Sequence, residues 1–305
     1  MAVVSTSFSL PIGNHRSLRR SPGKAFAVAT GAGVKVTEGE GNLPKVIIST
    51  PSGSEAELYL YGGCVTSWKI PSGKDILFVR PDAVFNKKKP ISGGIPHCFP
   101  QFGPGAIQQH GFARNMDWSL DDSQSTDDDT SASFVLTDGA YSRAMWDYAF
   151  HALYKVTVKP RSLCTELIVT NTDDKPFSFT TALHTYFSAS IEGVKVKGLK
   201  GCKTLDKSSD PNNPTFGVNE RDELSFPGFV DCIYLDAPNA ITLDNGGGEE
   251  ITIENTNWTD VVLWNPHVQM EACYRNFVCV ENAKIQSVDL PPGQNWKATQ
   301  IITVT

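Results

Sequence analysis

Hydrophobic and polar residues alternate along much of this chain with a period of two, which is typical of β-strands that have one buried face. The clearest example is the run 154–159, Tyr-Lys-Val-Thr-Val-Lys. Other short apolar or β-branched runs are separated by clusters of turn residues, and we interpret each run as a strand. These runs are 45–50, 56–61, 163–170, 177–183, 241–243, 251–253, 261–264, 277–281 and 300–305.

The connections between these runs predict how the strands pair. The turn Asn-Thr-Asp-Asp at 171–174 predicts an antiparallel hairpin of 163–170 with 177–183, and the turn at 244–248 predicts a second hairpin. No amphipathic helices intervene, so the pattern favours an all-β fold, a large antiparallel β-sandwich, over an α/β fold. We expect short helical turns at 82–87 and 141–148, and a solvated loop in the acidic stretch 121–131.

The N-terminal segment has a different composition from the rest of the chain. Its first 37 residues contain no Asp or Glu but hold five Arg and Lys residues among many serines, which is typical of an organelle transit peptide. The Ser/Thr-rich, uncharged start favours the chloroplast over the mitochondrion; a floppy basic N-terminus is the alternative. We predict a transit peptide and disordered N-terminus at 1–37, cleaved between about residues 25 and 33, and one domain at 38–305.

Charge and composition exclude several classes of partner. The formal net charge of −6 becomes roughly −11 once the basic leader is removed, which argues against nucleic acid as a partner. No apolar run approaches the roughly 18 residues that a membrane-spanning helix needs, so we expect no membrane insertion. The seven cysteines have no zinc-type spacing, and we interpret most of them as buried apolar side chains.

Two neighbouring segments contain candidate binding residues. The segment 91–104, ISGGIPHCFPQFGP, is apolar and rich in Gly and Pro, so it is either a rigid buried connection or a place where backbone approaches a ligand. In the segment 109–115, Gln109, His110 and Arg114 offer hydrogen-bond donors to hydroxyl or phosphoryl oxygens. Alone, this cluster is also compatible with a surface arginine and a structural histidine.

Two titratable residues stand at the ends of apolar runs. His184 follows the run 177–183, and Glu281 ends the run 277–281. A histidine beside apolar residues is usually a satisfied core side chain, and a carboxylate at a strand end is either exposed or held for use, because burying it unpaired is costly. The sequence contains no phosphate loop, dinucleotide fingerprint, serine-nucleophile elbow or metal-ligand helix.

Six ordered motifs together resemble a known family. They are GGIPHCFPQFG, QHGFARN, LHTYF, DCIYLD, VVLWNP and VCVEN, and they resemble the glucose-6-phosphate 1-epimerase branch of the galactose-mutarotase-like, or aldose 1-epimerase, superfamily, including its plant plastid members. The resemblance covers residues 43–305. It implies a galactose-mutarotase-like supersandwich with a ligand cleft on one sheet face, and an isomerase that needs no cofactor and no metal.

The resemblance also assigns roles to residues. It implies that His184 is the general acid and Glu281 the general base of a ring-opening reaction, and that Gln109, His110, Arg114 and Asp231 contact the substrate. The implied reaction interconverts the α and β anomers of a hexose 6-phosphate, with D-glucose 6-phosphate as the expected sugar. We therefore expect a stromal monomer whose partner is a small-molecule hexose phosphate.

One position departs from the family pattern. Many epimerases of this branch have an arginine directly before Gly-Gly-Ile-Pro, where this chain has Ser92, whose hydroxyl cannot supply a charge. Arg114 and the lysine run 87–89 are the candidates to replace that charge, although such a run is usually solvated. Two other functions stay open: a non-catalytic carbohydrate-binding protein and a structural subunit of a chloroplast membrane complex. The presence of both His184 and Glu281 favours the enzyme.

Overall fold

The computed structural model of this protein describes residues 33–211 and 213–305. Most of the expected transit peptide, residues 1–32, lies outside the described residues. The first strand, β1 (Val34–Glu38), includes residues 34–37, which lie before the domain boundary that the sequence predicts. It pairs with β2 (Pro44–Ser49) over its whole length.

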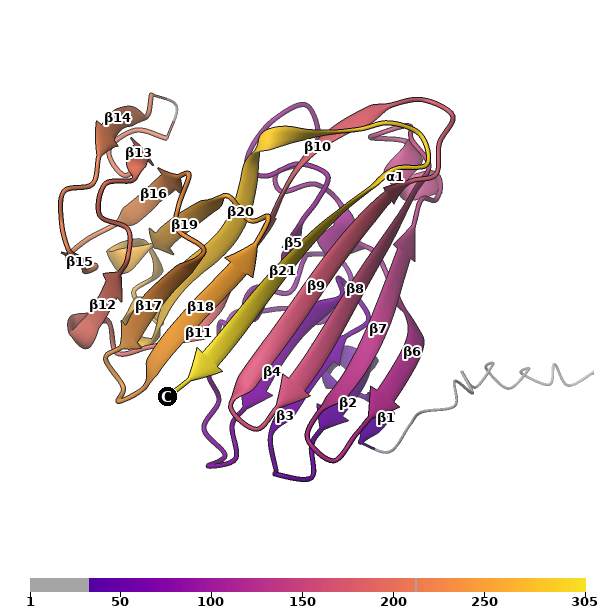
Figure 1. Ribbon diagram of the computed structural model, residues 1–305, viewed down its shortest axis with the longest axis horizontal. Helices are drawn as coiled ribbons and strands as arrows, with labels where there is room; N and C mark the ends of the chain where they lie inside the picture. The colour runs from indigo at the N-terminus through magenta and orange to yellow at the C-terminus, as the bar shows by residue number, and fades with distance from the viewer. Residues whose placement is uncertain (1–32, 212) are drawn as a thin grey trace, which may run out of the picture.

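The fold is a large antiparallel β-sandwich, as the sequence predicts. A nine-stranded sheet forms one layer, and an eight-stranded and a four-stranded sheet lie behind it (Figure 1). The four-stranded sheet has the order β1-β2-β3-β4, and the nine-stranded sheet has the order β15-β12-β17-β18-β21-β9-β8-β7-β6. The eight-stranded sheet has the order β14-β13-β16-β19-β20-β10-β5, with β11 paired to β20.

The elements have the following bounds. The four-stranded sheet is completed by β3 (Glu55–Tyr59) and β4 (Cys64–Lys69). The eight-stranded sheet contains β5 (His97–Cys98), β10 (Phe177–Leu183), β11 (Tyr186–Ser188), β13 (Lys203–Asp206), β14 (Thr215–Val218), β16 (Val230–Leu235), β19 (Asp260–Asn265) and β20 (Phe277–Leu290). The nine-stranded sheet contains β6 (Ser119–Ser125), β7 (Thr130–Thr137), β8 (Phe150–Lys159), β9 (Ser162–Asn171), β12 (Val194–Lys197), β15 (Glu223–Leu224), β17 (Ala240–Asn245), β18 (Glu250–Thr256) and β21 (Asn295–Val304).

Helices are short in the described part of the chain. They are α1 (Ala140–Arg143) and the 3-10 helices η1 (Glu40–Asn42), η2 (Ala113–Asn115), η3 (Ile191–Gly193), η4 (His267–Met270) and η5 (Tyr274–Asn276). Helix α1 confirms the start of the helical turn predicted at 141–148, whereas residues 82–87 form no helix. None of the described helices has the length and apolar character that crossing a membrane requires.

The period-two pattern places the main core between the sheets. In β8, Tyr154, Val156 and Val158 are fully buried, and the residues between them are only partly buried, as the alternation predicts. Strand β9 lies beside β8 with the same alternation. Burying one such apolar side chain contributes about 1.5–3 kcal/mol, so the strand pattern itself fixes which face turns inward.

One prediction about a connection is wrong. Strand β9 does not form a hairpin with β10; it pairs with β8 and β21, whereas β10 pairs with β5 and β20 in the other layer. The side-chain amide of Asn171 donates hydrogen bonds to the carbonyl oxygens of Lys175 (2.9 Å) and Leu290 (2.7 Å), which turns the chain towards the end of β20. The turn residues therefore change layers instead of reversing one strand.

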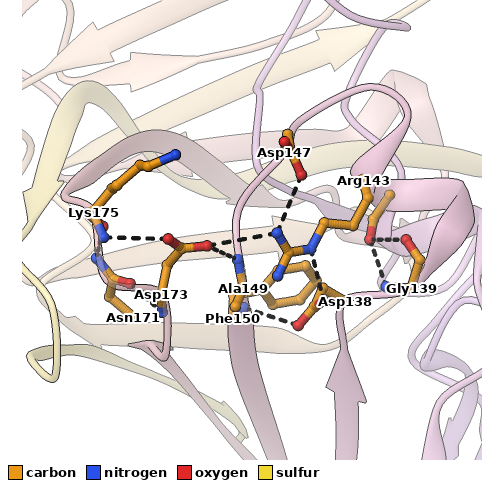
Figure 2. Close-up of polar contacts among 10 residues, drawn as sticks. Asp138, Gly139, Arg143, Asp147, Ala149, Phe150, Asn171, Asp173 and Lys175 are labelled. Atoms are coloured by element: carbon orange, nitrogen blue, oxygen red, sulfur yellow. Dashed lines mark hydrogen bonds and ion pairs between the residues drawn. The ribbon is translucent and has the colours of Figure 1, made fainter.

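Arg143 at the end of α1 holds this layer-changing turn in place (Figure 2). Its guanidinium contacts the carboxylates of Asp138 (2.9 Å), Asp147 (3.1 Å) and Asp173 (3.6 Å). The backbone N–H of Ala149 also donates to Asp173 at 2.6 Å. One cation thus ties α1 to the start of the β9–β10 connection.

The acidic stretch 121–131 is not a loop. It belongs largely to the hairpin of β6 and β7, which places β6 at the edge of the nine-stranded sheet. Only Leu120 of β6 is buried, because an edge strand of this kind faces solvent on most of its surface. Apolar and polar residues therefore do not alternate in β6, and the sequence pattern does not predict this strand.

Candidate active site

The candidate site lies on the face of the eight-stranded sheet that turns away from the main core. In β20, Val278 and Val280 belong to the main core, so the pleat directs Cys279 and Glu281 to the opposite face. The neighbouring strands follow the same rule. Val262 of β19 pairs with Glu281, and Asp231 of β16 pairs with Trp264 of β19.

These side chains line a cavity of about 520 Å³, which loops complete from above the sheet. All six site residues that the sequence singles out line it. They are His184, Glu281, Gln109, His110, Arg114 and Asp231. Residues up to 172 positions apart thus share one concave surface, as a ligand-binding cleft requires.

His184 is fixed by backbone and ring contacts. Its backbone N–H donates to the carbonyl oxygen of Pro96 at 3.0 Å, and its ring stacks on Tyr186 with centroids 4.9 Å apart and planes inclined by 13°. The edge of the pair faces Trp264, whose ring centroid lies 5.8 Å from that of His184. These contacts hold the imidazole in one orientation towards the cavity.

Gly94 in the segment 91–104 serves close backbone packing. Gly94 has φ +68°, and a Cβ there would lie 2.0 Å from the carbonyl oxygen of Val65. Gly111 in the following motif has φ +69°, and its Cβ would lie 2.1 Å from the carbonyl oxygen of Phe99. The interpretation as a rigid buried connection therefore holds around Gly94, while Ser92, Phe102, Gly103 and Pro104 of the same segment line the cavity.

Glu281 and His184 approach each other closely inside the cavity. Nδ1 of His184 lies 3.3 Å from Oε1 of Glu281, and the exposed fractions of the two side chains are 12% and 2%. The contact does not have hydrogen-bond geometry: among the described residues, Nδ1 of His184 and Oε2 of Glu281 have no hydrogen-bond partner. Buried polar atoms without partners are costly, and a ligand hydroxyl can satisfy both.

Burial shifts the pKa values of both groups towards their neutral forms. The pKa of Glu281 is raised well above its usual value by desolvation and by the carboxylate of Asp231, against the opposing charges of Lys207 and Arg114. The pKa of His184 is lowered well below its usual value by desolvation and then by His110, with smaller contributions from Arg114 and Arg80. These directions favour neutral His184 and protonated Glu281, the reverse of the protonation that the roles of general acid and general base lead us to expect.

The remaining polar groups offer donors and an acceptor to a ligand. Nδ1 of His110 accepts the backbone N–H of Gly103 at 3.2 Å, and Nε2 lies 3.4 Å from the side-chain amide nitrogen of Gln109. Desolvation lowers the pKa of His110 to about 3, so its ring is neutral. Arg114 donates from Nη2 to the carbonyl oxygen of Gln109 at 2.7 Å. The pKa of Asp231 is raised by desolvation, which Lys207 opposes.

Several cavity residues escaped the sequence analysis, among them Arg80, Tyr186, Lys207 and Trp264. Tyr186 and Trp264 lie inside motifs that the resemblance rests on, LHTYF and VVLWNP, so the signal was present. Arg80 follows an apolar run directly, as Glu281 does, but no motif marks it. The lysine run 87–89 does not line the cavity, and Lys87 pairs with Asp117 at 2.6 Å.

Three potential metal ligands also meet here. Donor atoms of His184, Cys279 and Glu281 all lie within 4.8 Å of one another. However, desolvation and the carboxylate of Glu281 raise the pKa of the Cys279 thiol well above its usual value. A protonated thiol is a poor metal ligand, so these side chains fit proton transfer better than metal binding.

Comparisons with known proteins agree with this fold. Residues 44–303 match the family model described as aldose 1-epimerase. A relative from Cenchrus ciliaris, named "Putative glucose-6-phosphate 1-epimerase", is 36% identical over 82% of this chain and 85% of its own length. An Escherichia coli K12 relative of the same name is 30% identical over 79% of this chain and 83% of its own length. The crystal structure of a "putative mutarotase" from Salmonella typhimurium superposes with a TM-score of 0.78 at 26% identity, covering 89% of this chain and 97% of the other.

Proposed function

This chain belongs to the aldose 1-epimerase family, and we propose that it interconverts the α and β anomers of a hexose 6-phosphate, with His184 and Glu281 as its acid–base pair. The observation that carries this proposal is the 3.3 Å approach of these two buried side chains on the wall of one cavity. Among the described residues, Nδ1 of His184 and Oε2 of Glu281 lack hydrogen-bond partners, and both side chains line the cavity that a sugar would fill.

Two observations support a phosphorylated sugar as the substrate. The curated relatives from Cenchrus ciliaris and Escherichia coli carry the name of a glucose-6-phosphate epimerase. In addition, a protein with a net charge of −6 directs Arg114 and Lys207 into this cavity, where they can attract an anion. D-Glucose 6-phosphate is therefore the substrate that we assign.

The reaction needs one proton acceptor and one proton donor. Glu281 removes the proton of the anomeric O1, whose O–H electron pair becomes the second bond of the C1=O1 carbonyl. The C1–O5 bond breaks, and its electron pair takes the proton that His184 donates to the ring oxygen. After rotation about C1–C2, the ring closes on the other face of the carbonyl while both protons return along the same route.

The pair must hold one proton for this cycle to run. A neutral His184 with a protonated Glu281 and a protonated His184 with an ionised Glu281 contain the same number of protons, so both belong to the same macroscopic state. The opposite pKa shifts of the two groups extend the pH range over which this state persists. A bound phosphate neutralises Arg114, whose charge lowers the pKa of His184, and thereby favours the form with the proton on His184.

The neighbouring groups position the sugar. The neutral ring of His110 can hydrogen-bond a sugar hydroxyl, and Asp231 can accept hydrogen bonds from sugar hydroxyls when ionised. The indole of Trp264 and the phenol of Tyr186 supply flat apolar surface on the same side of the cavity. An open-chain aldehyde held between these walls can rotate without leaving.

Exchange spectroscopy by NMR tests the proposal directly. Purified protein is mixed with D-glucose 6-phosphate, and the α–β exchange rate is compared with that of buffer, of His184→Ala and of Glu281→Gln. We expect acceleration by the native protein and a loss of about 10²- to 10⁴-fold in each variant, the usual contribution of one acid or base. Saturable sugar binding without acceleration would instead indicate a carbohydrate-binding protein.

For localisation we propose the chloroplast stroma, on the basis of the acid-free, Ser- and Arg-rich first 37 residues. A fluorescent protein fused behind residues 1–37 should collect in plastids. A structural subunit of a membrane complex would comigrate with thylakoid complexes after gentle solubilisation, whereas we expect the native protein to be recovered in the stromal fraction as a monomer.

A further inference from the structure

Arg80 and Ser92 lie opposite each other at one corner of the cavity. The backbone N–H of Arg80 donates to the carbonyl oxygen of Ser92 at 3.0 Å, and the adjacent residues Val79 and Gly93 form an antiparallel bridge. Both side chains line the cavity. Residues directly opposite in an antiparallel pair have Cβ atoms about 4.5–5.5 Å apart, so a side chain from position 80 can reach the space that one from position 92 would occupy.

From this placement we infer that Arg80 holds the phosphate of the substrate, supplying the guanidinium that relatives of this branch carry at the position of Ser92. The inference rests on the proposed function. It concerns specificity for the phosphorylated sugar and leaves the acid–base chemistry to His184 and Glu281.

The hydrogen bonds of Arg80 leave part of its guanidinium for a ligand. Nε and Nη2 donate to the carboxylate of Asp82 at 2.9 and 2.5 Å, so the two N–H groups of Nη1 can donate to another acceptor. The side chain of Arg80 is 17% exposed, whereas that of Asp82 is 63% exposed. Asp82 thus holds the guanidinium from the solvent side, while Arg80 itself borders the cavity.

The charge distribution within the cavity separates two ends. The charge of Arg80 acts on His184, whereas the charges of Lys207 and Asp231 act on Glu281. In a pyranose, the ring oxygen is bonded to C5, which carries C6 and its phosphate. Because His184 protonates the ring oxygen, the phosphate lies at the His184 end, which is the end of Arg80. The charge of Arg114 acts on both groups.

The test compares two sugars across three variants by NMR exchange spectroscopy. In Arg80→Met, kcat/KM for D-glucose 6-phosphate should fall roughly 10- to 100-fold, the loss expected for a hydrogen bond to a charged group. The loss for D-glucose should be at least tenfold smaller. The double variant Arg80→Met/Ser92→Arg should recover most of the preference for the phosphorylated sugar, because it returns the guanidinium from the opposite side.

Lys89→Met is the matched control, since it removes one positive charge from the same loop at a residue that does not line the cavity. It should leave the ratio of the two rates as in the native protein. Equal losses for both sugars in Arg80→Met, or an unchanged rate for the phosphorylated sugar, would overturn the assignment of Arg80.

A failure of the proposed function is distinguishable from a failure of this inference. If the native protein accelerates neither sugar, the epimerase proposal fails, and the same variants are compared by their Kd for D-glucose 6-phosphate. A Kd that weakens roughly tenfold or more in Arg80→Met and recovers in the double variant supports the phosphate contact. A Kd that does not change in Arg80→Met rejects it.

Discussion

The ring Nε2 of His97 lies 3.2 Å from the carbonyl oxygen of Gly63, and no described residue is a hydrogen-bond partner of the other ring nitrogen, Nδ1. The ring is packed between Trp118, at a centroid distance of 4.8 Å, and the edge of Tyr154, at 4.4 Å. Desolvation lowers the pKa of His97 to about 4. Folding therefore excludes a proton that the unfolded chain binds below about pH 6.5.

This relationship predicts a loss of stability in acid. Because the folded pKa of His97 is depressed, the free energy of unfolding falls as the pH drops from about 6.5 towards 4, by up to about 1.4 kcal/mol per pH unit for one proton. His97→Leu should cost about 1–3 kcal/mol at pH 7.5, because the Gly63 carbonyl loses its donor. Between pH 6.5 and 4.5 it should show a shallower slope than the native protein. Urea unfolding at several pH values measures both; parallel slopes would contradict the assignment.

His184 and Glu281 should behave as one catalytic unit. Residues that act together show grossly non-additive losses, because the second substitution removes a partner that has already lost its function. The double variant His184→Ala/Glu281→Gln should therefore exchange anomers about as slowly as the slower single variant. A double variant whose loss equals the product of the two single losses would show that the residues act independently.

Opposite charges near Glu281 should move the pH–rate profile in opposite directions. The carboxylate of Asp231 raises the pKa of Glu281 and the ammonium group of Lys207 lowers it. Asp231→Asn should therefore move the alkaline limb of the kcat profile, where the pair loses its last proton, to lower pH. Lys207→Met should move it to higher pH. Shifts of both variants in the same direction would exclude this electrostatic coupling.

Arg143 should stabilise the chain at neutral pH more than in acid. The hydrogen bonds that Asp173 accepts, first of all from the backbone N–H of Ala149, lower its pKa. Arg143 contacts the carboxylate of Asp173 and those of Asp138 and Asp147. Such stabilisation is present above the unfolded pKa of about 4 and is lost as the pH falls through the folded value. Arg143→Gln should lower the melting temperature by a few degrees at pH 7, and the difference should shrink below pH 4.

The control for Arg143→Gln is Lys88→Gln, which removes a charge from an exposed residue. We expect it to leave the melting temperature nearly unchanged at both pH values, as substitutions on the surface usually do. An equal decrease in the melting temperature of the two variants would mean that the stability depends on net charge and not on the contacts of Arg143.

The sequence predicted the strands better than their connections. Runs such as 154–159 and 177–183 predict strands, because apolar and polar residues alternate in a half-buried strand. The glycine-rich turn at 244–248 predicts the hairpin of β17 and β18. The turn at 171–174 looks like another hairpin, but the hydrogen bonds of Asn171 to distant backbone carry the chain into the second layer. No local pattern contains that information, because Leu290 lies 119 positions away.

The candidate site was predicted through its motifs rather than through its geometry. The resemblance selected Gln109, His110, Arg114, His184, Asp231 and Glu281, and the fold brings all six to one cavity. The protonation expected for His184 and Glu281 could not be predicted, because desolvation depends on burial that only the folded chain creates. Arg80 was missed for a related reason. It becomes a candidate phosphate ligand only because it lies opposite Ser92, and this pairing is a property of the fold.

The strands β16, β19 and β20 turn one row of side chains to the core and the other to the cavity. Alternate residues of the same strands therefore determine substrate preference and folding. Evolution can replace a cavity-facing residue and change which sugar fits, while its two neighbours keep the strand in register. This separation is consistent with a relative at 26% identity that retains the shape of the chain with a TM-score of 0.78. It also makes the cavity face the natural place to redesign the specificity of this fold.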